Sequence, residues 1–300
     1  MKQSLCTITS NVEISPGMYL MWIEAPDIAS ISHPGQFITV NCEGFTLRRP
    51  FSIHQVAAGE SKESQIALLF KVVGKGTFWL SQQHSDDKID ILEPLGKGFT
   101  IASRAKNLLL VAGGIGIAPL VFLAQYASSQ HSVSLIQGAS TVRELYPFSS
   151  LRPRNKFGGS NLLSLPTGVQ FIPVTEDGTM GRKGMATDIL LDSLDWADQV
   201  FACGPIDMYK AMAITLNPSP SKGESLTLPS PSKGEGKGEG EKRSEESKLR
   251  KCQVSLEVRL GCGIGACYAC TINTKKGLKQ VCRDGPVFEL DDILWQEVRI

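Results

Sequence analysis

The sequence lacks the features that would place it in a membrane or on a nucleic acid. No apolar stretch in its 300 residues approaches the roughly 18 needed to span a bilayer. Residues 1–25 include Glu13 and Glu24 and no unbroken apolar run, so no export signal is visible. The net charge is only +1, which gives no indication of an anionic partner. We expect a cytoplasmic chain with reduced thiols that binds neither nucleic acid nor membrane.

Cysteine is sparse except in one segment. Four of the eight cysteines fall within residues 262–282, in the pattern C-x4-C-x2-C-x11-C. Cys262, Cys267 and Cys270 have the spacing of a plant-type [2Fe–2S] site, and Cys282 supplies a fourth thiolate from downstream. The glycines between them allow a tight loop that directs N–H groups at sulfur. The remaining cysteines show no pairing pattern.

Other uses of these four thiols are weighed against the cluster. Structural zinc also takes four thiolates, but usually as two C-x2–4-C pairs, whereas gaps of four and eleven residues occur here. Disulfides suit secreted chains, and no export signal supports them. Chance clustering is the third alternative. The spacing favours an iron–sulfur site.

The first hundred residues are predicted to form a β-barrel. Apolar or alternating runs at 36–40, 65–73 and 88–92 are separated by turns that contain proline and glycine. Short strands at this spacing are typical of a small barrel. We therefore assign residues 1–100 to this first domain.

The pattern changes at about residue 106, where strands begin to alternate with helices. We predict strands at 107–112, 133–137, 169–174, 199–203 and 254–257, and helices at 118–128, 186–194 and 207–216. This alternation indicates a doubly wound, parallel α/β sheet over residues 101–257. Residues 217–248 interrupt it with a repeated Pro-Ser-Pro-Ser-Lys-Gly-Glu and few apolar residues, so a disordered insertion is expected there. Residues 258–300 form the small cysteine domain.

Two short motifs in the barrel region fit a flavin nucleotide. Arg49-Pro-Phe-Ser52 follows a strand, and arginine can bind a pyrophosphate while serine reaches a flavin ring. Leu69-Phe-Lys71 ends a strand, and Gly74-Lys-Gly-Thr77 opens a helix whose free N–H groups can bind an anion. Taken alone, each motif is also compatible with an ordinary surface turn or tight loop.

Two further motifs fall at the carboxyl ends of predicted parallel strands, where open α/β sheets bind ligands. Gly113-Gly-Ile-Gly116 joins a strand to a helix, although it is not the G-x-G-x-x-G fingerprint and an ordinary turn would look similar. Cys203-Gly-Pro205 ends another strand. Its thiol could lie beside a nicotinamide, or it is a small buried side chain.

Taken in order, these motifs resemble those of the ferredoxin-reductase superfamily. The C-terminal CGIGACYAC and VCRDGPVF resemble the electron-transfer subunits of bacterial NAD-linked (class B) dihydroorotate dehydrogenases. The resemblance covers the chain apart from residues 217–248. One departure is Val258, where this family often has a second acidic residue.

The resemblance implies three cofactors: FAD in the barrel, NAD on the α/β domain and a [2Fe–2S] cluster at the C-terminus. It implies that electrons from the FMN of a separate catalytic subunit, in a heterotetramer of two plus two, pass through cluster and FAD to NAD+ during pyrimidine biosynthesis. Implied FAD contacts are Arg49, Pro50, Phe51, Ser52, Leu69, Phe70, Lys71, Gly76 and Thr77; expected nucleotide contacts are Gly113, Gly114, Gly116, Cys203, Gly204 and Pro205; implied iron ligands are Cys262, Cys267, Cys270 and Cys282.

Two other functions stay open on the sequence. A related FAD/[2Fe–2S] reductase subunit could serve a hydrogenase, a sulfide-type reductase or a ferredoxin:NADP oxidoreductase. A non-catalytic nucleotide-binding module with structural zinc is the third hypothesis. The choice of nucleotide is also open, because Arg143 could meet a 2′-phosphate but is more typical of a surface charge; we favour NAD.

Overall fold

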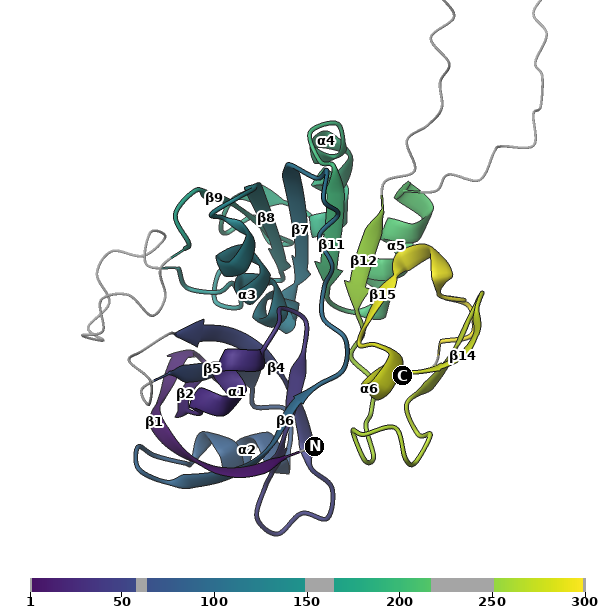
Figure 1. Cartoon of the computed structure of the whole chain (residues 1–300). Coiled ribbons are helices and arrows are strands. Elements are labelled where there is room, and N and C mark those ends of the chain that lie inside the picture. The colour runs from purple at the N-terminus through teal and green to yellow at the C-terminus, as the bar shows by residue number, and fades with distance from the viewer. Residues whose placement is uncertain (1, 58–63, 149–164, 217–250, 299–300) are drawn as a thin grey trace, which may run out of the picture.

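The computed structural model describes residues 2–57, 64–148, 165–216 and 251–298, in three parts that pack side by side (Figure 1). The insertion expected at 217–248 lies outside the described residues. Within the described ranges, no helix is long and apolar enough to cross a membrane.

The N-terminal part is a closed antiparallel barrel with strand order β1-β2-β5-β4-β3-β6, which confirms the predicted barrel. Its interior is filled by apolar residues from alternate strand positions, including the fully buried Ile53, Ile66 and Leu68. The elements are β1 (Gln3–Ser15), β2 (Met18–Glu24), α1 (Pro26–Ile31), β3 (Phe37–Asn41), β4 (Arg49–Ala57), β5 (Gln65–Lys71), α2 (Lys75–Ser81) and β6 (Lys88–Leu95).

The second part is a sheet with strand order β10-β9-β8-β7-β11-β12-β15, in which all strands but β15 run parallel. The strands are β7 (Asn107–Gly113), β8 (Ser132–Ala139), β9 (Val169–Thr175), β10 (Arg182–Lys183), β11 (Gln199–Cys203), β12 (Cys252–Ser255) and β15 (Val287–Glu289). The helices are η1 (Gly114–Gly116), α3 (Ile117–Ala127), η2 (Ala186–Ile189), α4 (Leu190–Leu194) and α5 (Ile206–Leu216).

Helices cover both faces of this sheet, as the unbroken apolar run in β7 predicts. Leu108 and Leu110 point into the core beneath α3. Leu109 and Val111 point into the opposite core, beneath α4 and α5. The doubly wound α/β fold is therefore confirmed.

The C-terminal part is continuous with the sheet. It contains β13 (Thr271–Thr274), β14 (Gly277–Gln280), α6 (Val281–Asp284), β15 and η3 (Leu290–Asp292). β15 pairs antiparallel with β12, and β12 starts at Cys252, two residues before the predicted start. Strands from both sides of residue 257 therefore share one sheet, and the domain boundary expected there stays a prediction.

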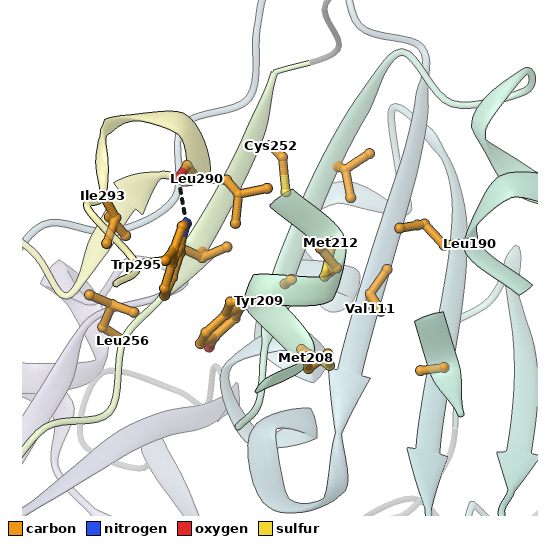
Figure 2. Packing of buried hydrophobic residues seen from close by; sticks show 14 of the residues in the cluster. Val111, Leu190, Met208, Tyr209, Met212, Cys252, Leu256, Leu290, Ile293 and Trp295 are labelled. Atoms are coloured by element: carbon orange, nitrogen blue, oxygen red, sulfur yellow. Dashed lines mark hydrogen bonds between the residues drawn. The ribbon is translucent and has the colours of Figure 1, made fainter. Parts of the chain in front are cut away.

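An aromatic contact fastens the same two parts together (Figure 2). The ring centroids of Trp295 and Tyr209 lie 5.3 Å apart, and the Trp295 Nε1–H donates a hydrogen bond to the carbonyl oxygen of Leu290 at 3.0 Å. Tyr209 on α5 donates its hydroxyl hydrogen to the Ser255 carbonyl at 2.6 Å. Helix α5 thus holds the end of β12 and the C-terminal residues in one core.

The barrel is joined to the sheet by a buried polar contact. His54 on β4 is fully buried; its ring nitrogens lie 2.9 Å from the Ala118 carbonyl and 3.0 Å from the Tyr146 hydroxyl. Burial lowers the pKa of His54 to about 4, so the ring is neutral.

Candidate functional site

A cavity of about 470 Å³ lies where the three parts meet. The barrel motifs that the sequence singled out separately come together on one side of it. That side is formed by Phe37, Pro50, Phe51, Ser52, Leu69, Phe70, Lys71, Val73 and Thr77, and the rest by Ile115, Ala118, Ser255, Leu256, Glu257, Val258, Arg259, Leu260, Val281 and Pro286. A mostly apolar cavity of this size suits a flat ring system such as a flavin.

Arg49 and Gly76 lie next to the cavity rather than in its lining. The Arg49 side chain crosses Gly76 so closely that a Cβ there would be 2.8 Å from Nε. Its guanidinium lies 5.0 Å from the Phe45 ring centre. At the start of α2, Thr77 Oγ1 accepts from the N–H groups of Val73 and Gly74 at 2.9 and 3.1 Å. Gly76 thus leaves room for the arginine to lie along α2.

The cavity carries three charged side chains, Lys71, Glu257 and Arg259. Glu257 follows β12, and its side chain keeps an exposed surface that opens into the cavity, while the cavity walls surround its carboxyl group. Burial raises the pKa of its carboxyl. The sequence interpretation assigned no role to these residues after β12, because their approach to the barrel depends on tertiary packing.

Cys262, Cys267 and Cys270 lie on the loop before β13, and Cys282 lies on α6. We call these cysteine-bearing residues the cysteine loop, and in it backbone N–H groups surround sulfur. Cys262 Sγ accepts from the N–H groups of Ile264, Ala266 and Cys267 at 3.4, 3.2 and 3.3 Å. Cys282 Sγ accepts from the Gly265 N–H at 3.1 Å. Gly265 adopts a φ of +82°, a conformation that glycine adopts most readily. The predicted role of these glycines in directing N–H groups at sulfur matches this geometry.

The thiols fall into an outer and an inner pair. Cys262 and Cys267 are at the surface, and the N–H of Cys262 donates to Cys267 Sγ at 3.4 Å. Cys270 and Cys282 are buried, with their Sγ atoms 3.3 Å apart. Two neighbouring pairs suit a cluster in which each of two irons takes two thiolates.

The electrostatics of the loop favour anionic sulfur at its outer end. Partial burial opposes ionisation of Cys262, but the N–H groups of Ile264, Cys267 and Ala266 lower its pKa to about 6. Burial, followed by the neighbouring Cys270, raises the pKa of Cys282 to about 12. Within the described ranges, no three His, Cys, Asp or Glu side chains are placed to hold a single metal ion.

The cysteine loop touches the barrel directly. A Cβ on Gly263 would lie 3.0 Å from Thr39 Cγ2. Thr39 pairs across the sheet with Pro50, which lines the cavity. On the inner side, Val281 lines the cavity and directly precedes Cys282. The inner thiol pair is therefore separated from the cavity by little more than one residue of the wall.

A second cavity, of about 420 Å³, lies at the carboxyl edge of the parallel sheet, as the strand–helix turns predict. Its lining comes from the ends of four neighbouring strands and from η2 and α5. The residues are Gly113, Gly114, Gly138, Ala139, Ser140, Glu144, Glu176, Gly184, Met185, Ala186, Thr187, Pro205, Asp207, Met208 and Ala211. Among the predicted contacts, Gly113, Gly114 and Pro205 are in this lining.

Gly116, Cys203 and Gly204 instead pack the two turns against each other. A Cβ on Gly116 would lie 2.1 Å from the Cys203 carbonyl oxygen, and one on Gly204 would lie 3.0 Å from Gly113 Cα. The Cys203 thiol has no exposed surface, and burial raises its pKa well above the ordinary value. This placement matches the alternative of a small buried cysteine, and contact with a nicotinamide stays a prediction.

One ion pair connects the two cavities. Lys71 Nζ, from the first lining, lies 2.7 Å from Glu144 Oε1, from the second. Arg143, the residue considered for a 2′-phosphate, is exposed and belongs to neither lining. Its carbonyl accepts from Ser15 Oγ at 2.6 Å and helps join the barrel to the sheet.

Barrel, nucleotide-type sheet and cysteine loop meeting at one cavity define the ferredoxin-reductase fold with an added iron–sulfur domain. The structure of an NADH-dependent reduced ferredoxin-NADP oxidoreductase is similar over 98% of this chain and 91% of that one, with a TM-score of 0.74 and 24% identity. A Neisseria gonorrhoeae ferredoxin NADP+ reductase with bound FAD and NADP is similar over 72% of this chain and 91% of that one, with a TM-score of 0.57 and 17% identity. Both likenesses concern the fold.

Sequence comparison identifies the family. Residues 257–294 match the iron–sulfur cluster binding domain of dihydroorotate dehydrogenase B. The chain is 34% identical, over 94% of its length and 95% of the other, to the dihydroorotate dehydrogenase B (NAD(+)) electron transfer subunit of Desulforamulus reducens. It is 33% identical, over 96% and 97%, to that of Caldanaerobacter subterraneus subsp. tengcongensis. The chain belongs to the family of dihydroorotate dehydrogenase B electron transfer subunits, which confirms the resemblance seen in the motifs.

Proposed function

We propose that this chain is the electron-transfer subunit of an NAD-dependent dihydroorotate dehydrogenase that serves pyrimidine biosynthesis. It takes electrons from the FMN of a separate catalytic subunit and delivers them to NAD+. Family membership supports this function, and one structural observation carries it. The inner thiol pair borders, through Val281, the same cavity that the barrel motifs line.

Each cofactor has residues suited to hold it. We propose that FAD is held by Arg49, Pro50, Phe51, Ser52, Leu69, Phe70, Lys71, Gly76 and Thr77, and the [2Fe–2S] cluster by Cys262, Cys267, Cys270 and Cys282. NAD occupies the sheet-edge cavity at Gly113, Gly114 and Pro205, while Gly116, Cys203 and Gly204 shape its floor. A flavin, when bound, exchanges single electrons for a hydride, the conversion that lies between a one-electron cluster and NAD.

The protein's own groups prepare the site for this transfer. N–H groups aimed at sulfur stabilise anionic thiolates. The apolar walls from Phe51 and Leu256 exclude water from the flavin cavity. Lys71 supplies a positive charge at the cavity and, through Glu144, keeps the two cavities adjacent.

The face around the outer thiol pair suits the docking of a redox partner. Ile264, Tyr268 and Leu278 are exposed apolar side chains in the cysteine domain, and Cys267 is exposed in the same segment. We propose that the FMN-containing catalytic subunit covers this face, in a heterotetramer of two plus two.

Because the described thiols are free, we place the assembly in the reducing cytoplasm.

Composition and assembly test this proposal. The purified chain should hold about two irons, no zinc, and one FAD. Co-expressed with an FMN-containing dihydroorotate dehydrogenase subunit, it should elute as a complex whose mass by light scattering fits two copies of each. Stoichiometric zinc without flavin would contradict the proposal and indicate a non-catalytic module with structural zinc. A complex only with another redox protein, such as a hydrogenase, would assign the chain to a different reductase.

A further inference from the structure

The order of the strands along the sheet-edge cavity determines which end of the cavity lies next to the flavin cavity. From β11 to β9 its lining runs through Pro205, Gly113, Ser140 and Glu176. Ile115 and Ala118, which directly follow the β7 turn, line the flavin cavity. The β7/β11 end therefore adjoins the flavin cavity, and the β8/β9 end is remote from it.

This direction orients a dinucleotide, given the proposed function. Hydride exchange requires the nicotinamide to touch the flavin, with reacting atoms about 3–3.5 Å apart. The nicotinamide must then occupy the β7/β11 end. The adenosine half, with its ribose, falls at the β8/β9 end, beside Ser140 and Glu176.

Glu176 places hydrogen-bond acceptors at the β8/β9 end of the cavity, the end remote from the flavin cavity. Its side chain is exposed, and Oε1 accepts from Ser140 Oγ at 3.0 Å, which holds the carboxylate at the cavity edge. A carboxylate has about four acceptor sites, so acceptors remain for a ribose hydroxyl. The same charge repels a 2′-phosphate, which carries about −1.5 to −2.

Among the described residues, no Lys, Arg or His forms an ion pair with this carboxylate. The described lining of the cavity contains no Lys, Arg or His. Of the nearby cations, Arg182 pairs with Asp192 at 2.6 Å, and Lys183 lies along Gly178. The other lining glutamate, Glu144, is already paired with Lys71.

We propose that Glu176 is the residue that selects NAD over NADP, by accepting a hydrogen bond from the adenosine ribose 2′-hydroxyl and repelling a phosphate there. Ser140 is its positioning partner. Selection thus resides at the β8/β9 end, away from the chemistry, and depends on one negative charge.

Direct binding tests the proposal without turnover. NAD+ and NADP+ are titrated by calorimetry into the oxidised, FAD-loaded chain, in which neither is reduced. Glu176→Gln removes the charge at similar size and should lower the NAD+ preference about tenfold, the loss of one hydrogen bond to a charged group. Glu176→Asp keeps the charge and should retain most of the preference. Glu43→Gln, at an exposed acid of the barrel, is the matched control and should change nothing.

The outcomes separate this inference from the proposed function. If the unaltered chain binds NAD+ and Glu176→Gln keeps the same preference, the inference is wrong and the function stands. The inference also fails if Glu43→Gln shifts the preference equally, because net charge alone would then explain it. A chain that binds neither nucleotide contradicts both. Flavin absorbance checks that each variant is folded and loaded.

Discussion

Backbone N–H groups donate hydrogen bonds to the sulfur atoms of the cysteine loop. The Cys262 sulfur alone accepts three of them. Such donors are built into the chain conformation, so they hold a cluster environment without a partner side chain that could move away. Backbone geometry also sets the contact at Gly116, because the absence of a side chain there lets the turn after β7 pack against the turn after β11.

Glycine at 116 should matter more than glycine at 114. A Cβ on Gly116 would lie 2.1 Å from a backbone oxygen, whereas one on Gly114 meets nothing within 4 Å and only strains a φ of +54°. We expect Gly116→Ala to lower the free energy of unfolding by about 3 kcal/mol or more and Gly114→Ala by about 1 kcal/mol. Urea denaturation of both variants measures this; equal losses would show that the turns are not in tight contact.

Single residues were predictable where spacing along the chain encodes the chemistry. The four cysteines and the barrel motifs each lie within a short segment; the structure brings the barrel motifs to one cavity, and Val281 of its wall directly precedes Cys282. Glu176, Glu257 and Val281 gave no such signal, because each reaches a cavity only through folding. The carboxyl-edge rule would have singled out Glu176 once β9 was known to lie beside β8.

At the level of elements, β4 of the barrel and α3 of the sheet are held together by His54. Burial lowers its pKa to about 4, against about 6.5 in an unfolded chain. Between these values the unfolded chain binds a proton that the folded chain does not. Stability contributed by His54 is therefore complete above about pH 6.5 and falls as the pH drops towards 4.

His54→Gln should remove this pH dependence. Between pH 7 and pH 5 the His54 contribution to the free energy of unfolding should fall by about 2 kcal/mol in the unaltered chain. The variant is less stable at pH 7 but should lose about 2 kcal/mol less on acidification. Urea unfolding of both proteins at the two pH values gives the difference, in which other titrating groups cancel. Parallel losses in the two proteins would mean that His54 is not neutral and buried.

Elements with strong periodicity were predicted well. The strand at 107–112 and the helix at 118–128 appear as β7 and α3 with ends shifted by one residue. β15 was missed: three residues of intermediate burial carry no periodic signal and become a strand only by pairing with β12. Residues 217–248, expected to be disordered, lie outside the described residues.

In the whole molecule, the cysteine domain is held against the sheet by a shared hydrophobic core as well as by the continuous chain. Trp295→Ala should remove the ring that packs on Tyr209 and leave a cavity in that shared core. We expect a loss of about 3–5 kcal/mol in the free energy of unfolding. Trp196→Ala, at a residue 39% exposed, should cost much less. If the two substitutions cost the same, the domain is not held by this core.

The central claim is that one chain connects a dihydroorotate-oxidising partner to NAD+ through its cysteine loop. The direct test mixes the loaded chain with the FMN-containing catalytic subunit, dihydroorotate and NAD+, and follows NADH formation. We predict steady NADH production that Cys267→Ala abolishes, and that Cys42→Ala, at a buried cysteine outside the loop, leaves in place. NADH oxidation by an artificial dye should survive in both variants. Undiminished NADH production by Cys267→Ala, or none from the unaltered pair, would contradict the account.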